Sequence, residues 1–163
     1  MSAKPSLTDL LAILARWFLA VVFIYMGLSK ALEPEQFLKL TRQYNLMSSP
    51  LLLNSVAATL PWFEIFCGIL LLAGVAVRGT ALVLIAMLVP FTVVVLKRAL
   101  AIASAKSIAF CAVKFDCGCG GGEVLICHKL VENSFLILLA CGLLIGHGRQ
   151  LAARFSLLPF RKA

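Results

Sequence analysis

The feature that most constrains this chain is a set of four long apolar segments, at residues of about 10–31, 56–77, 79–96 and 124–147. A helix needs roughly 20 consecutive apolar residues to cross the hydrocarbon core of a bilayer. Of all residues, 62% are hydrophobic and 13% are charged, which leaves too little charged surface for a soluble domain. We therefore predict an all-α polytopic membrane protein, a four-transmembrane-helix bundle that forms one domain over residues 1–163.

The connections between the segments differ in length. Only Arg78-Gly79 separates the second and third segments, which predicts two antiparallel neighbours. After the first segment, Pro34 stands between two glutamates, a pattern typical of a helix start. Residues 36–46 place apolar side chains against charged ones, which predicts an interfacial helix on the bilayer. We interpret residues 97–116 as an amphipathic extension of the third helix that ends near Lys114.

The net charge of +8 comes from Lys and Arg residues at the segment ends and near the C-terminus. This distribution favours contact with anionic lipid headgroups over nucleic-acid binding. With four spans both termini lie on one side, and the basic cluster near the C-terminus favours the cytoplasmic side for them. We expect the connection between the third and fourth spans to face outward.

That connection holds a cysteine-rich loop at residues 106–128. It contains four of the six cysteines and one histidine, namely Cys111, Cys117, Cys119, Cys127 and His128. A disulfide between Cys117 and Cys119 would close a tight ring, and a strained disulfide is more easily reduced. Gly118 between them reaches backbone angles that other residues avoid. The pattern favours a redox pair that passes oxidising equivalents to a thiol, with Cys111 or Cys127 as the resolving cysteine.

The same loop admits other interpretations. Cys117 and Cys119 offer two soft thiolates to a metal ion. The ligand set for Cu(I) or zinc can be completed by Cys111, Cys127 or His128. Sulfane-sulfur handling and a structural disulfide also stay open at this point. Cys67 and Cys141 differ from these thiols, because they lie within apolar segments where cysteine behaves as a small hydrophobe.

Ionisable residues inside predicted spans are functional candidates by default. Glu64 lies in the second segment at the end shared with Lys30 and the cysteine loop. We interpret it as a proton acceptor for thiol oxidation, or as a partner of Lys30 or of a loop backbone. Arg16 lies toward the opposite face, where it can snorkel to headgroups or anchor a quinone or an anionic lipid head. Trp62 is either an interfacial anchor or the border of a quinone pocket.

At the cysteine motif the sequence resembles the DoxX/MauE group of small four-helix bacterial membrane proteins, and its MauE-like branch in particular. That branch carries C-G-C-F-G and then an R-N pair on the following helix. This chain has Cys117-Gly118-Cys119-Gly120-Gly121 and Glu132-Asn133 at the matching places. Weaker likeness extends over the first two segments, at Leu14-Ala15-Arg16, Gly27, Lys30, Pro61, Glu64, Gly68 and Gly74.

The resemblance implies a redox-associated protein of the bacterial inner membrane with a periplasmic cysteine loop. MauE-like members are linked to disulfide formation in a periplasmic enzyme subunit, and DoxX relatives to thiosulfate:quinone oxidation. The leading hypothesis is a thiol–disulfide oxidoreductase in which Cys117 and Cys119 act on a periplasmic thiol protein or a small sulfur compound, with a membrane quinone as electron acceptor. The alternatives are a soft-metal binding or transport protein and a sulfane-sulfur protein of the DoxX type. Substrate, acceptor and oligomeric state stay open.

Overall fold

The computed structural model describes residues 7–44, 49–118 and 122–145. Four helices in this part of the chain are long and apolar enough to cross a membrane, which confirms the predicted all-α bundle. They are α1 (Leu7–Leu32), α3 (Pro50–Ala73), α4 (Val77–Lys106) and α5 (Ile126–Ile145). The smaller elements are α2 (Pro34–Gln43), the 3-10 turn η1 (Phe110–Ala112), β1 (Lys114–Asp116) and β2 (Glu123–Leu125).

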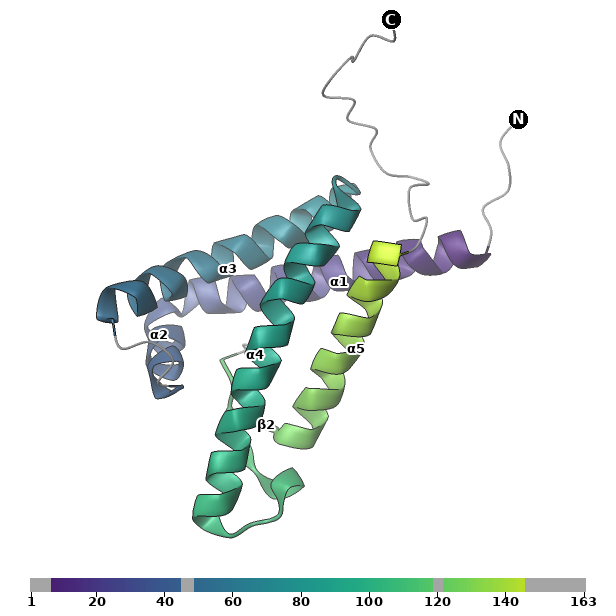
Figure 1. The fold of residues 1–163 in the computed structure, drawn as a ribbon. Helices are drawn as coiled ribbons and strands as arrows, with labels where there is room; N and C mark the ends of the chain where they lie inside the picture. Colours follow the sequence, from purple (N-terminus) through teal and green to yellow (C-terminus); the bar gives the residue numbers. More distant parts are fainter. Residues whose placement is uncertain (1–6, 45–48, 119–121, 146–163) are drawn as a thin grey trace, which may run out of the picture.

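The four long helices form two pairs. Helix α1 packs along α3 and α4 packs along α5, while α1 also contacts α5. Figure 1 shows the pairs close together near the turn between α3 and α4 and diverging toward the other end. Helix α2 and the antiparallel β1–β2 hairpin lie at that diverging end. The fold therefore places the cysteine-rich loop where the helices separate.

The contact between α1 and α3 depends on two small residues. A Cβ atom on Gly27 would lie 2.6 Å from the carbonyl oxygen of Pro61. A Cβ atom on Gly68 would lie 2.9 Å from the carbonyl oxygen of Ala20. In membranes, small residues let helix backbones approach closely and gain van der Waals contact. These glycines set the distance between the two helices.

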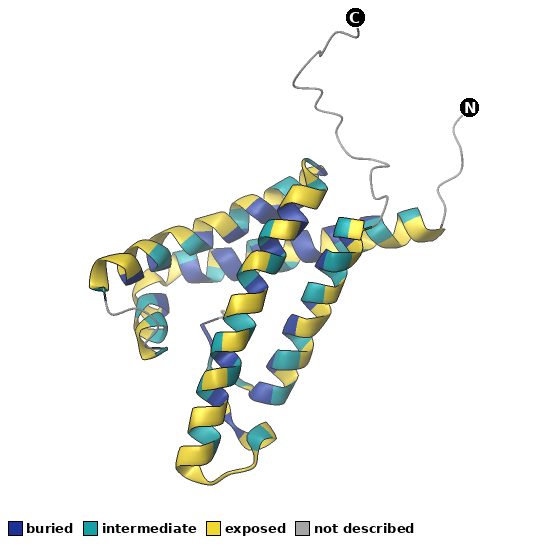
Figure 2. Ribbon diagram, in the orientation of Figure 1, coloured by how far each residue is buried: buried dark blue, intermediate teal, exposed yellow. Residues whose placement is uncertain are grey.

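Two apolar clusters fill the interior, and Figure 2 shows the buried positions on the inward sides of the helices. The turn-end core lies toward the α3–α4 turn and includes Leu19, Phe23, Leu71, Leu84 and Ala140. The hairpin-end core lies at the diverging end and includes Met26, Val95, Val113, Phe115, Cys117 and Ile126. Large apolar side chains on the outer faces, such as Phe66 and Leu138, are exposed and suit contact with lipid.

The second and third spans begin earlier than the sequence predicted. Helix α3 starts at Pro50, so Pro61 lies inside the helix. The turn to α4 occupies residues 74–76, and Arg78-Gly79 already belongs to α4. Gly74 ends α3 with a φ of 70°, a left-handed conformation that glycine adopts without strain. The antiparallel arrangement of the two helices stands, but the predicted position of the turn was wrong.

The segment after the third span also differs from the prediction. Helix α4 ends at Lys106, not near Lys114, and Ser107 at its end has a φ of 50°. The chain then makes η1 and the short hairpin, in which Phe115 pairs with Val124. Each strand has three residues, too few for an alternating pattern to stand out in the sequence. Helix α2, by contrast, starts at Pro34 as predicted.

Candidate functional site

The first half of the C-G-C motif is held in place by contacts from α2 and the hairpin. Cys117 is 2% exposed and follows β1 directly. The hydroxyl of Tyr44 donates a hydrogen bond to its carbonyl oxygen at 3.0 Å. Asp116 Oδ1 accepts a hydrogen bond from the backbone N–H of Gly118 at 2.8 Å. Cys117 is disulfide-bonded, whereas Cys119 lies outside the described residues.

Gly118 has a backbone conformation that the motif needs. Its φ is +77°, a region that other residues enter only with strain. A Cβ atom placed there would lie 3.5 Å from the ring of Phe37 on α2. The glycine thus lets the chain turn directly against α2, which supports the sequence-based reason for a glycine between the two cysteines.

Arg98 on α4 joins α2 to the hairpin. Its guanidinium donates hydrogen bonds to the backbone oxygen and to the side-chain oxygen of Gln43 at the end of α2. It also lies over the rings of Tyr44 at 5.1 Å and Phe115 at 5.5 Å, distances at which cation–π attraction operates. Burial raises the pKa of Tyr44 to about 12, with Arg98 opposing and Asp116 adding to the shift. The phenol therefore stays protonated and can donate to Cys117.

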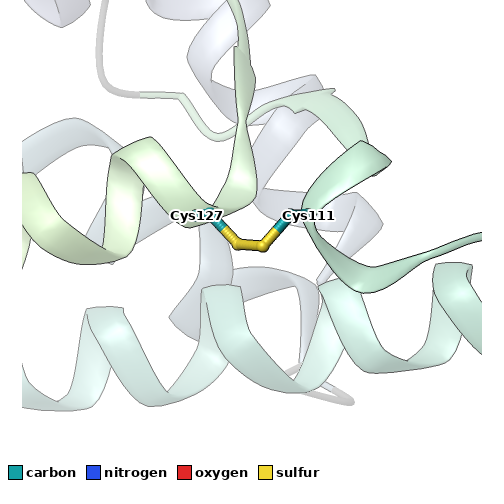
Figure 3. The surroundings of a disulfide bond; sticks show 2 residues. All are labelled: Cys111 and Cys127. Atoms are coloured by element: carbon teal, nitrogen blue, oxygen red, sulfur yellow. A yellow bond between two sulfur atoms is a disulfide. The ribbon is translucent and has the colours of Figure 1, made fainter.

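A disulfide joins Cys111 on η1 to Cys127 in the first turn of α5 (Figure 3). Their Cα atoms are 5.1 Å apart, within the range usual for disulfides. The backbone N–H of Ile126 donates to the oxygen of Val113 at 3.1 Å, so the same two segments are also joined through the main chain. Cys111 at one end of this disulfide is exposed, and Cys127 at the other is partly buried against the hairpin-end core that contains Cys117.

Glu64 and Lys30 form a buried ion pair between α3 and α1. Lys30 Nζ lies 2.5 Å from Glu64 Oε1 and 2.7 Å from Oε2, and both residues are 5% exposed. The ammonium group is also 5.5 Å from the centre of the Phe37 ring. The predicted contact between Glu64 and Lys30 is therefore present, at the same end as the cysteine motif.

Cys117 lines two cavities on different sides of the motif. One, of about 230 Å³, lies among α1, α2, α3 and α4 and also has Lys30, Glu64 and Tyr44 in its wall. The other, of about 310 Å³, lies between α1, α5 and the hairpin, with Lys129 and Glu132 in its wall. The structure therefore places Cys117 between two cavities whose walls include the ionisable side chains of Lys30, Glu64 and Tyr44 in one and of Lys129 and Glu132 in the other.

Sequence reasoning missed the burial of Lys129 and Asn133 on α5. Lys129 is 3% exposed and donates to Glu132 Oε2 at 3.0 Å. Asn133 is fully buried and donates from Nδ2 to Thr92 Oγ1 on α4 at 3.1 Å. Both positions continue the helical stripe of Leu136, Ala140 and Leu143. A spacing of three and four residues was the signal that could have identified them.

Several sequence candidates lie apart from this site. Arg16 is buried, and within the described chain its Nε and Nη1 have no hydrogen-bond partner. It therefore does not snorkel outward as expected. Trp62 is 66% exposed on α3 and is not among the residues that line the cavity around Glu64. His128 is exposed at the start of α5.

The described residues contain no group of three His, Cys, Asp or Glu side chains that could hold a metal ion. The proposed ligand set included Cys119, which lies outside those residues. It also included Cys127, whose sulfur is bonded to Cys111. A disulfide sulfur is not a thiolate, so the metal interpretation would require this bond to be reduced.

Comparison with known proteins agrees with the architecture and the motif. No curated protein and no solved structure matches the chain. The family model described as methylamine utilisation protein MauE matches residues 8–146, which include all four spanning helices and the cysteine-rich loop. The chain is thus a multi-pass membrane protein that belongs to the MauE family.

Proposed function

We propose that this protein is a membrane thiol–disulfide oxidoreductase that takes electrons from a dithiol outside the bilayer and passes them to a quinone within it. The observation that carries the proposal is the position of Cys117. Its side chain is buried in the wall of an apolar cavity between spanning helices. Cys117 is thus shielded from water and lies beside a space suited to a lipid-soluble acceptor.

The second disulfide supports a relay of two cysteine pairs. A substrate thiolate attacks the exposed sulfur of Cys111, which forms a mixed disulfide and releases Cys127 as a thiolate. Cys127 packs against the core that contains Cys117. It then attacks the C-G-C disulfide. The second substrate thiol frees Cys111, and Cys111 restores its bond to Cys127, so that Cys117 and Cys119 are left as a dithiol.

The electrons balance over the cycle. The substrate loses two electrons and two protons and becomes a disulfide, while the C-G-C pair becomes a dithiol. The C-G-C pair then gives two electrons to the quinone, releases two protons and becomes a disulfide again, while the quinone takes up two protons and becomes a quinol. The Cys111–Cys127 bond ends each cycle as it began.

The family description names methylamine utilisation. We propose that the dithiol belongs to a protein of that system and that the hairpin end faces the periplasm of a bacterial inner membrane. The exposed position of Cys111 supports a partner that approaches from outside the bundle.

The test uses the full chain in lipid nanodiscs with a reduced dithiol peptide and a short-tailed ubiquinone. We expect peptide oxidation and quinol formation in equal amounts. The Cys117→Ser/Cys119→Ser variant should lose both, whereas the control Cys67→Ala/Cys141→Ala, which removes the two free thiols, should keep both. Quinol formation that persists without Cys117 and Cys119 would overturn the mechanism.

The same preparations address the alternatives. Elemental analysis of protein purified without added metal should find no stoichiometric copper or zinc. Stoichiometric metal that disappears in the Cys117→Ser/Cys119→Ser variant would favour the soft-metal interpretation. A persulfide mass increase on a loop cysteine after thiosulfate treatment would favour sulfane-sulfur transfer. Either result, without quinone reduction, would replace the proposal.

A further inference from the structure

The cavity of about 230 Å³ beside Cys117 has a mixed wall. Most of it is apolar and comes from facing helices, with Leu60 on α3 and Phe91 on α4 among the contributors. Its polar groups are few and include Lys30, Glu64 and Tyr44. Sites for small organic molecules commonly combine an apolar wall with a small number of placed polar groups. The volume is below the ~300–1,000 Å³ usual for drug-sized ligands, so it suits a single ring system.

A second hollow, of about 200 Å³, adjoins the first near the end of α1. Its wall is more polar and includes Ser29, Glu33, Gln36 and Asp116. Lys30 lines both hollows, as do Phe37 and Leu40 on α2. Lys30 therefore lines both a polar cleft at the bundle end and the apolar cavity.

The Lys30–Glu64 pair is a costly feature to bury. Removing two charges from water carries a penalty of several kcal/mol per ion that their attraction offsets only with good geometry. Both carboxylate oxygens of Glu64 contact the single ammonium group, so the pair satisfies itself within the bundle. Buried ionisable residues in membrane spans commonly mark ligand or proton pathways. Here Lys30 lines both hollows and Glu64 lines the apolar one.

We infer that this cavity holds the ring of the quinone, and that Lys30 and Glu64 carry protons to it from the polar cleft. This inference rests on the proposed function. The two electrons come from the Cys117–Cys119 dithiol, which becomes a disulfide. The two protons that the quinone takes up are delivered through Lys30 and Glu64, and the two thiol protons are released to the cleft, so that the totals balance.

The binding test uses a photoactivatable azidoquinone on the full chain in nanodiscs, followed by peptide mapping. Adducts are expected on residues 56–64 of α3 and 87–94 of α4, and excess short-tailed quinone should compete them away. In the variant Leu60→Trp the indole ring occupies the cavity. It should exclude the quinone ring and lower this labelling by at least about tenfold. Leu52→Trp is the matched control, because Leu52 lies on the same helix but is 57% exposed.

The outcomes separate the two proposals. The Cys117→Ser/Cys119→Ser variant should lose turnover but keep the labelling. Labelling in the cavity without any thiol-dependent quinone reduction would retain the site and overturn the proposed function. Thiol-dependent quinone reduction with adducts elsewhere, for example in the hollow beside Lys129, would retain the function and overturn this site. Labelling that Leu60→Trp leaves unchanged would also overturn it.

The role of Lys30 and Glu64 in proton transfer is tested separately from quinone binding, by the rate of quinol formation. The double variant Lys30→Met/Glu64→Leu removes the pair without leaving a lone charge, so it should fold and still be labelled by the azidoquinone. Quinol formation should slow at least about tenfold, while a single oxidation of the dithiol peptide should proceed at the normal rate. The control Glu35→Gln/Lys39→Met changes exposed charges on α2. Unchanged quinol formation in the Lys30→Met/Glu64→Leu variant would overturn the proton role.

Discussion

The two ends of the bundle are built differently. At the α3–α4 turn, the turn-end core brings Leu19, Leu71 and Leu84 together with no exposed surface. At the hairpin end, the helix pairs diverge, and the space contains an ion pair, a disulfide and two cavities that share Cys117. Apolar packing at one end holds the helices so that the other end can keep open space. We interpret the turn end as the scaffold and the hairpin end as the working part.

The largest effect is expected from breaking the ion pair at the hairpin end. Lys30→Met leaves Glu64 buried without its partner, which should destabilise the protein by about 3–5 kcal/mol. Lys30→Met/Glu64→Leu should recover most of that loss, because two apolar side chains replace the pair. Denaturant unfolding of both variants in mild detergent measures the difference. A single variant as stable as the double variant would show that the pair is not isolated from water.

A cavity in the turn-end core should reduce stability without changing the site. Leu84→Ala removes a fully buried side chain and should cost about 2–5 kcal/mol. Azidoquinone labelling near Leu60 and alkylation of the reduced C-G-C thiols should stay normal at a temperature where the variant is folded. Altered labelling in the folded variant would mean that the two ends are not separable as scaffold and working part.

The Tyr44 hydroxyl should contribute little to the stability of the protein, but it should hold the C-G-C motif in position. Tyr44→Phe removes the hydrogen bond to the carbonyl oxygen of Cys117 and should cost about 0.5–1.5 kcal/mol. The freed motif should also react faster with a thiol reductant, followed by mass spectrometry. Tyr25→Phe is the control, because Tyr25 is 62% exposed. Equal reduction rates in both variants would show that Tyr44 does not hold the motif.

The effect that is smallest at neutral pH is the ionisation of Tyr44, which changes stability only in alkaline solution. Tyr44 has a pKa of about 12 in the folded protein against 10.0 for an unperturbed tyrosine. Because the folded state keeps this proton longer than the unfolded chain, the resulting stability is fully present below pH ~10 and is lost as pH rises through ~12. Ultraviolet absorbance of tyrosinate in a Tyr25→Phe background measures this titration. Ionisation of Tyr44 near pH 10 would show that the hairpin does not shield it.

The sequence predicted those features that depend on local composition. Four runs of apolar residues indicated the spans, and Pro34 marked the start of α2 because proline suits the first helical turn. The contact of Lys30 with Glu64 was one of the options predicted for Glu64, since both residues lie near the same end of neighbouring spans. The helix pattern on α5 would also have shown Lys129 on the inner face.

Other features depend on contacts that no local pattern encodes. Helix α4 ends at Lys106 without a glycine to mark the end in the sequence. Ser107 occupies the left-handed position where a glycine is more usual. The cavity is lined by helices of both pairs, α1 and α3 from one and α4 from the other, so it depends on how the pairs diverge and not on any one segment. The placing of Tyr44 on the motif joins residues 73 positions apart in the chain. Quinone candidates chosen from sequence, Arg16 and Trp62, therefore lie away from the cavity.

A single-turnover experiment tests the central claim most directly. The full chain is reduced in nanodiscs, freed of reductant and mixed with one equivalent of short-tailed quinone, and quinol and remaining thiols are counted. The account predicts one quinol for each pair of thiols lost, with Cys117 and Cys119 as the first pair to become oxidised. Absence of quinol, or quinol formed while Cys117 and Cys119 stay reduced, would contradict it.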